Sequence, residues 1–135
     1  MSYEEVPHTA DVKIRIHAQT LEELFSDACE ALMMVMYGHS RKGIMKKEIA
    51  VTSSDIDSLL LDFLSEILFI SEVERIVFSK AMVHIDGQNL SAELEGEPFH
   101  KKIHAKGTEV KGISYSGLSI RHDANGYMVD IVFDV

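Results

Sequence analysis

The sequence predicts an α+β fold in which a mostly antiparallel sheet carries two main helices packed on one face. The first observation is the order of patterns, because strand, helix, strand and helix are followed by a run of four further strands. The second is that no crossover helices separate these last strands, which disfavours a parallel doubly wound fold. The third is the length of 135 residues, which fits a single domain over residues 1–135.

The first strand and the first helix have clear boundaries. Residues 12–18 alternate apolar and polar side chains, which predicts a half-buried strand. Thr20 follows, and Glu23 three residues later completes a capping-box pattern at the start of a helix. Apolar residues then recur at helical spacing until Gly38, the predicted end. Cys29 lies on this apolar stripe, and we interpret it as a core residue.

The middle of the chain repeats the strand and helix order. Residues 44–52 predict a second strand, and residues 53–55 begin a second helix. The apolar arc of this helix is wide, which indicates a central position in the fold. Residues 76–85 and 90–94 predict two strands of a hairpin, because Asp86-Gly87 between them is a turn signal.

The last third of the chain is less regular. Residues 95–107 are polar, and a short helix and a loop are both compatible with them. Residues 110–120 and 127–133 predict strands, and residues 122–126 predict the turn that joins them, because Asn-Gly favours a positive φ.

Charge and composition narrow the class of protein. Thirteen basic against 22 acidic residues give a net charge of 13 − 22 = −9, which argues against a protein that wraps nucleic acid by itself. Contact with a basic nucleic-acid enzyme remains open. The acidic N-terminal segment lacks a signal-peptide pattern, and no apolar run approaches the ~20 residues that span a bilayer. We therefore expect a cytoplasmic protein without membrane contact.

Common catalytic signatures are missing from the sequence. It contains no phosphate-binding glycine-lysine loop, no Gly-x-Gly-x-x-Gly, no His-Glu-x-x-His and no nucleophile elbow. His100 and His104 are four residues apart, a spacing that would align two metal ligands on a helix. No third ligand follows at a typical distance, so this pair is a weak zinc candidate.

Acidic groups at the two ends of the chain form a stronger candidate. The last strand runs to the final residue, so Asp134 and the α-carboxylate of Val135 are adjacent and fixed. If the first and last predicted strands pair, Asp11 completes a cluster of three carboxylates, which is unfavourable without a cation. Oxygen ligands suit Ca²⁺ or Mg²⁺, and His8 in the shell would favour a softer ion. The alternative is an ordinary turn in which Thr9 or Asp11 binds local amides.

Four segments in order, reaching both termini, resemble the archease family. They are His8-Thr9-Ala10-Asp11, residues 57–66 of the second helix, Glu109-Val110-Lys111-Gly112-Ile113-Ser114-Tyr115, and the acidic ending at residues 130–135. The sequence departs from the family pattern at Ser116, where His is usual, at Gly112, where Ala is usual, and at Phe99-His100, where Asp is frequent.

The resemblance implies a non-enzymatic accessory protein. Archeases assist the RtcB-type tRNA-splicing ligase, which joins RNA ends with GTP and Mn²⁺ through a guanylylated histidine. The accessory protein promotes guanylylation and multiple turnover of the ligase. The implied partner is therefore that ligase, with GTP in the complex and tRNA contacted only indirectly.

The resemblance also assigns roles to residues. Asp11, Asp134 and Val135 would bind a divalent metal, with Ca²⁺ expected first and Mn²⁺ or Mg²⁺ as alternatives. His8 and Lys111 would belong to the same functional surface. Lys111 has two interpretations, because it can neutralise the carboxylates or reach a nucleotide phosphate on the partner.

Two other functions stay open at this point. A metal-dependent hydrolase of a phosphate or nucleotide would use the carboxylate oxygens to activate a water molecule. A chaperone-like interaction module would use the methionine-rich surface of the first helix and the net charge of −9.

Overall fold

Two antiparallel sheets enclose a layer of helices in the computed structural model, which describes residues 3–6 and 11–135. The larger sheet consists of β1 (Tyr3–Val6), β2 (Val12–Ala18), β6 (Gly112–Ile113), β7 (Arg121–Asp123) and β8 (Gly126–Asp134). Its order is β1-β2-β8-β6, and β7 also pairs with β8. The smaller sheet consists of β3 (Met45–Thr52), β4 (Ile76–Asp86) and β5 (Asn89–Pro98), in the order β3-β5-β4. The predicted α+β class with antiparallel pairing is confirmed, and the division into two sheets is new.

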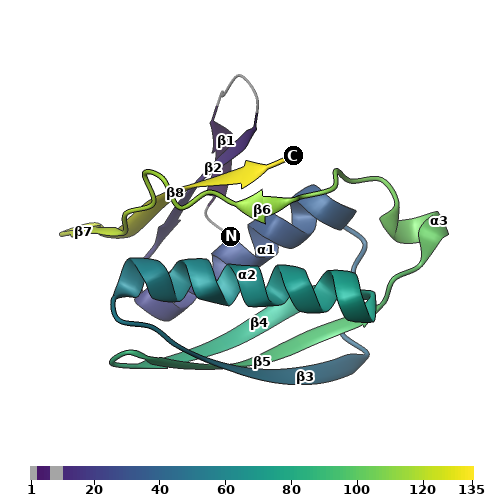
Figure 1. Ribbon diagram of the computed structural model, residues 1–135, viewed down its shortest axis with the longest axis horizontal. Coiled ribbons are helices and arrows are strands. Elements are labelled where there is room, and N and C mark those ends of the chain that lie inside the picture. Colours follow the sequence, from purple (N-terminus) through teal and green to yellow (C-terminus); the bar gives the residue numbers. More distant parts are fainter. Residues whose placement is uncertain (1–2, 7–10) are drawn as a thin grey trace.

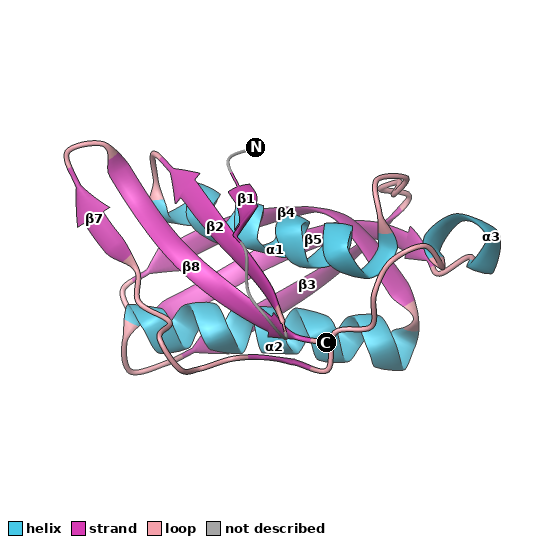
Figure 2. Ribbon diagram, turned by 90° about the horizontal axis from the view of Figure 1, so that it is seen from above, coloured by secondary structure: helices cyan, strands magenta, loops and turns pink. Residues whose placement is uncertain are grey.

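The two main helices, α1 (Leu21–Tyr37) and α2 (Ile56–Glu74), lie side by side between the sheets (Figures 1 and 2). Thr20 caps α1 by accepting the Glu23 N–H at 3.1 Å, and α1 ends at Gly38 with φ of 85°, as predicted. Asp55 caps α2 by accepting the Ser58 N–H at 2.8 Å. Within the described residues, no helix is long and apolar enough to cross a membrane.

One continuous hydrophobic core joins both sheets to both helices. The rings of Phe25 on α1 and Phe63 on α2 lie 5.7 Å apart between centroids, and Phe133 of β8 is fully buried. Cys29 is 1% exposed, which confirms its predicted place in the core. Burial raises the pKa of the Cys29 thiol to about 12, so it stays protonated at neutral pH.

Four segments differ from the sequence-based expectations. The turn predicted over residues 122–126 is shorter, because Arg121–Asp123 forms β7 and pairs with β8 up to Gly126. The strand β1 was not predicted, and β5 extends beyond Leu94 to Pro98 before the short helix α3 (Lys101–His104). The strand expected over residues 110–120 is wrong for most of its length, because only Gly112–Ile113 pairs. A turn follows, in which the Leu118 N–H binds the Tyr115 carbonyl and Gly117 has φ of 77°. Such a positive φ favours glycine and interrupts an extended strand.

The pairing of β2 with β8 matters most for the candidate site. The two strands are antiparallel, and their register runs from Ala18 opposite Tyr127 to Val12 opposite Phe133. The sequence left the pairing of the first and last predicted strands as a condition for the carboxylate cluster, and the structure meets that condition. It also brings the residues just before β2 and at the end of β8 to one edge of the molecule.

Candidate functional site

The ends of β2 and β8 hold the two acidic side chains that the sequence singled out. Asp11 directly precedes Val12, and Asp134 directly follows Phe133, the partner of Val12 in the register. Because the strands are antiparallel, Asp11 and Asp134 lie at the same end of the pair. Asp134 is exposed, and Asp11 is partly buried.

Burial of alternate residues fixes the position of the β8 end. Val129, Ile131 and Phe133 are fully buried and point into the core, as the period of two in a strand requires. Asp134 comes one residue after the last of them and therefore points to the opposite side of the strand. Val135 is partly buried and packs against the core.

The short strand β6 places Lys111 next to Asp134. The Lys111 N–H donates to the Asp134 carbonyl at 2.7 Å, and Gly112 is the register partner of Asp134. A Cβ atom built on Gly112 would lie 3.8 Å from Oδ2 of Asp134, so the carboxylate lies over this glycine. Among the described residues, no carboxylate lies within ion-pair distance of the Lys111 ammonium.

A cavity of about 570 Å³ adjoins Lys111. It lies where the C-terminal ends of α1 and α2 meet the segment that leads into β6, and Lys111 and Glu72 are both in its wall. Arg75 caps α2 in the left-handed conformation with φ of 54°, which is uncommon for a residue with a side chain. Its guanidinium carbon lies 4.7 Å from the centre of the Phe99 ring, a cation–π distance.

A chain of hydroxyl groups forms part of the same cavity wall. The hydroxyl of Ser71 donates to the Ile76 carbonyl at 2.6 Å. A serine hydroxyl has one proton, so in the 2.6 Å contact between the Tyr37 and Ser71 hydroxyls the tyrosine must donate. Burial raises the pKa of Tyr37, and this effect exceeds the lowering by the hydrogen bond to Ser71.

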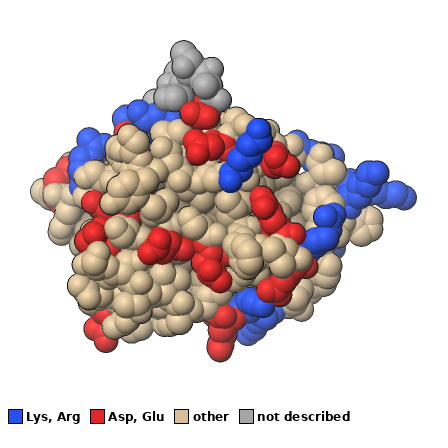
Figure 3. Space-filling model, viewed as in Figure 1, with Lys and Arg blue, Asp and Glu red and all other residues tan. Residues whose placement is uncertain are grey.

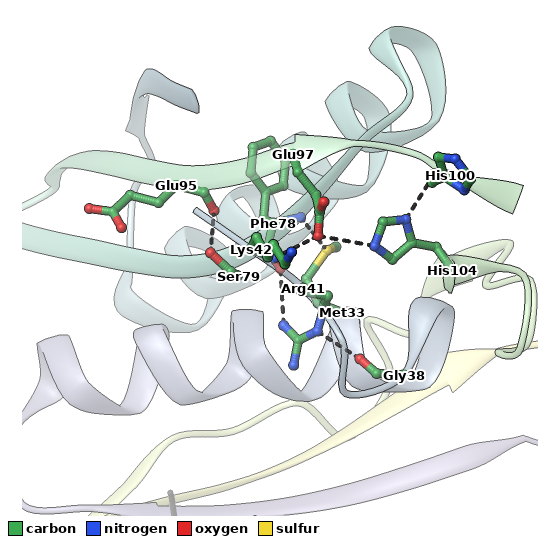
Figure 4. Close-up of polar contacts among 10 residues, drawn as sticks. All are labelled: Met33, Gly38, Arg41, Lys42, Phe78, Ser79, Glu95, Glu97, His100 and His104. Carbon is green, nitrogen blue, oxygen red and sulfur yellow. Dashed lines mark hydrogen bonds and ion pairs between the residues drawn. The ribbon is translucent and has the colours of Figure 1, made fainter. Parts of the chain in front are cut away.

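His104 connects the cavity to a buried polar network (Figure 4). Its Nδ1 accepts the N–H of His100 at 2.9 Å, and its Nε2 lies 3.2 Å from Oε2 of Glu97. The same Glu97 oxygen accepts the N–H of Lys42 at 2.6 Å. Because Nδ1 is an acceptor, the proton of the neutral ring is on Nε2 and is donated to Glu97.

The histidine arrangement differs from a zinc pair. His104 is 1% exposed and has both ring nitrogens engaged, whereas the side chain of His100 is exposed. Because they are four residues apart, the backbone N–H of His100 can donate to the ring of His104. Across residues 3–6 and 11–135, no group of three His, Cys, Asp or Glu side chains is placed to hold a metal ion.

The structure places four of the five residues predicted for the site near the same strand ends. Asp11 directly precedes β2, Lys111 directly precedes β6, Asp134 ends β8 and Val135 follows it. His8 lies outside the described residues. Sequence reasoning missed the cavity, because its walls come from segments without a shared motif. The lining residues are Met36, Tyr37, Ser71, Glu72, Arg75, Phe99, His104, Ala105, Gly107, Thr108, Glu109, Val110 and Lys111.

Comparison with known proteins gives one consistent result. The model of the Archease protein family (MTH1598/TM1083) matches residues 3–135. The chain is 34% identical to the protein archease of Methanosarcina mazei, with 98% of this chain and 95% of the relative covered. It is 38% identical to the protein archease of Saccharolobus islandicus strain M.14.25, with 99% of both chains covered. The chain belongs to the archease family.

Solved archease structures share this fold. The solution structure of Methanobacterium thermoautotrophicum protein 1598 superposes with a TM-score of 0.87 at 29% identity and covers 99% of both chains. The crystal structure of a Thermotoga maritima archease, described as a possible chaperone, gives a TM-score of 0.68 at 19% identity. It covers 98% of this chain and 96% of the other, and at that identity it supports the fold alone.

Proposed function

We propose that this archease is a non-enzymatic activator of an RtcB-type RNA ligase that promotes guanylylation and repeated turnover of the ligase. Family membership over residues 3–135 supports the choice of partner. The observation that carries the proposal is the placement of Asp11 and Asp134 at one strand end, with Lys111 bonded to the backbone of Asp134. This arrangement places two carboxylates and a lysine close to one end of the larger sheet.

A divalent metal ion suits this donor set. Asp11, Asp134 and the carboxylate of Val135 supply only oxygen ligands, which favours Ca²⁺, with Mn²⁺ or Mg²⁺ as alternatives. Two carboxylates held on neighbouring strand ends repel each other unless a cation lies near them. The third ligand in this proposal is the Val135 carboxylate, which is not a side chain. When bound, the metal supplies positive charge that links the two strand ends.

The protein residues then determine how the activator acts. An activator must bind one state of its partner more favourably than another. The Lys111 ammonium, which no described carboxylate pairs, is available to reach a nucleotide phosphate such as that of GTP on the ligase. The net charge of −9 suits docking to a basic RNA-binding enzyme, so tRNA is contacted through the ligase. A cytoplasmic location belongs to the same proposal.

Ligase turnover tests the proposal directly. A limiting amount of RtcB-type ligase is mixed with excess cleaved tRNA halves, GTP and Mn²⁺, with and without this protein. We expect the wild type to convert one turnover into many, and we expect Asp11→Asn and Asp134→Asn to abolish the stimulation. Asp86→Asn is the matched control, because this exposed aspartate lies on the hairpin of the other sheet.

Each other outcome has a distinct meaning. Full stimulation by Asp11→Asn and Asp134→Asn would show that the activator role is right and the metal site is wrong. Loss of stimulation on adding residues after Val135 would support its carboxylate as a ligand, and full stimulation would remove that ligand from the proposal. Absence of stimulation by the wild type would refute the activator role. Phosphate release from GTP by the isolated protein would then favour a hydrolase, and suppressed aggregation of unrelated proteins would favour a chaperone-like module.

A further inference from the structure

The outward side of α2 exposes two large apolar side chains. Phe69 is 61% exposed and Val73 is 63% exposed. They are four residues apart on the helix, so they are neighbours on its surface. The opposite side of α2 is buried, with Phe63 and Ile67 fully enclosed. The exposed pair is therefore not required to complete the core.

The charge of α2 has a single sign. From Ile56 to Glu74 the helix contains no Lys, Arg or His. Three of its carboxylates are engaged within the chain: Asp57 with the Ile120 N–H, Asp62 with the Ser53 hydroxyl and Glu74 with Lys47. Glu66 and Glu72 are exposed, and within the described part of the chain neither forms a hydrogen bond or an ion pair with another side chain.

These groups form one surface. Residues 66, 69, 72 and 73 follow at helical spacings of three and four, so they lie on one side of the helix. We call Glu66, Phe69, Glu72 and Val73 the α2 face. Figure 3 looks onto the side of the molecule where α2 lies in Figure 1, and there several acidic side chains, with some basic ones, border an uncharged area.

The charge of the α2 face limits what can cover it. A second copy paired by two-fold symmetry would set carboxylates of one copy against those of the other. Nucleic acid and anionic lipid would meet the same repulsion. A protein surface with an apolar depression and Lys and Arg around it is complementary to the α2 face. Its apolar centre would pack against Phe69 and Val73, and its basic side chains would pair with Glu66 and Glu72.

We infer that the α2 face docks onto such a basic, apolar-centred protein surface and that this surface belongs to the ligase. The last step rests on the proposed function. The α2 face is continuous with the candidate site, because Glu72 lines the same cavity as Lys111. A single partner surface that covers the α2 face therefore also reaches the strand ends of β6 and β8.

If the α2 face provides docking and the strand ends provide activation, variants at the two places should have different effects. A change at the α2 face weakens docking, so more protein is needed for half-maximal stimulation of the ligase, and the maximum is unchanged. A change at Asp134 lowers the maximum itself. The combined Phe69→Ala and Val73→Ala variant removes the apolar centre and keeps every charge. Truncation of a hot-spot residue at the centre of an interface costs tenfold or more in affinity, and with Phe69 and Val73 in that position we expect the half-maximal concentration to rise about tenfold.

The experiment measures both ligase stimulation over a concentration series and direct binding to the ligase by calorimetry. Met82→Ala is the matched control, since Met82 is an exposed apolar residue (40%) on β4 of the smaller sheet. Glu66→Lys is the second variant, and it should weaken binding and reduce the loss of affinity that added salt causes in the wild type. Thermal unfolding of each variant checks that the fold is retained, as expected for exposed side chains.

Failure of this inference differs from failure of the proposed function. If the wild type neither binds nor stimulates the ligase, the proposed function fails and this inference falls with it. If the wild type binds and the double variant binds as tightly as Met82→Ala, the inference alone is wrong. If light scattering shows a wild-type dimer that the double variant converts to a monomer, a second copy covers the α2 face and the inference is overturned.

Discussion

The hydroxyl chain from Tyr37 through Ser71 to Ile76 leads to a prediction that depends on which group donates. Ser71 is 1% exposed, and its one proton goes to the carbonyl of Ile76 on the edge strand β4. Tyr37 therefore donates to Ser71. Ser71→Ala removes both hydrogen bonds and leaves the Ile76 carbonyl without this donor, whereas Tyr37→Phe removes one bond and leaves the other intact.

The expected losses of stability follow from this count. A hydrogen bond contributes about 1 kcal/mol net, and an unsatisfied buried group costs about 1–3 kcal/mol. We therefore expect Ser71→Ala to lower the free energy of unfolding by about 2 kcal/mol and Tyr37→Phe by about 1 kcal/mol. The tyrosine contact is already lost in Ser71→Ala, so the double variant should be about as stable as Ser71→Ala alone.

Urea unfolding followed by circular dichroism measures these differences. With a urea dependence of about 2 kcal/mol/M, Ser71→Ala should move the midpoint down by about 1 M and Tyr37→Phe by about half as much. A loss in Tyr37→Phe that equals or exceeds the loss in Ser71→Ala would refute the assigned direction. Fully additive losses in the double variant would show that the two hydroxyls are not coupled.

Three further results are expected from the same structure. The two bonds from Arg15 lower the pKa of Asp130. The Asp130 carboxylate therefore stabilises the fold at pH values above the pKa of an unfolded aspartate, about 3.9. This stabilisation is lost as the pH falls through the lowered pKa of the folded state. Asp130→Asn should cost up to about 1 kcal/mol in urea unfolding at pH 7, and this cost should vanish in strong acid; a cost that persists there would contradict the assignment. Cys29, with a pKa of about 12 and 1% exposure, should react with iodoacetamide at pH 8 only after unfolding, as mass spectrometry would show. Gly107→Ala should lower the melting temperature, because the new Cβ would lie 2.1 Å from the Met36 carbonyl oxygen; an unchanged melting temperature would mean that this loop moves aside.

The sequence predicts best where local signals and burial agree. Both ends of α1 were predicted correctly, because a threonine cap and a glycine with positive φ act locally. The end of α2 has no such signal, since Arg75 takes the left-handed position that glycine usually occupies. The segment after Ile113 alternates like a strand, but a turn at Gly117 takes it away from the sheet. Alternation alone does not say whether a partner strand is available.

The candidate site shows the same limit. The sequence connected Asp11 and Asp134 only on the condition that the first and last strands pair, and the register shows that they do. The contact between Arg75 and Phe99 could not be predicted, because the residues lie on separate elements without a shared period. Their contact depends on the end of β5, where the Phe99 N–H binds the Arg75 carbonyl at 2.7 Å. Tertiary pairing of this kind has no signature in a single sequence.

The hydrophobic core fixes the backbone of the candidate site. Lys111 and Asp134 each follow a fully buried residue, Val110 and Phe133, so the core fixes the backbone on both sides of the bond that joins them. A site anchored in this way keeps its geometry when a partner binds, and little ordering cost is added at that step. The α2 face lies on a helix whose other side is part of the same core. Docking and activation would therefore use one rigid body, and a partner that binds the helix meets the strand ends in a fixed orientation.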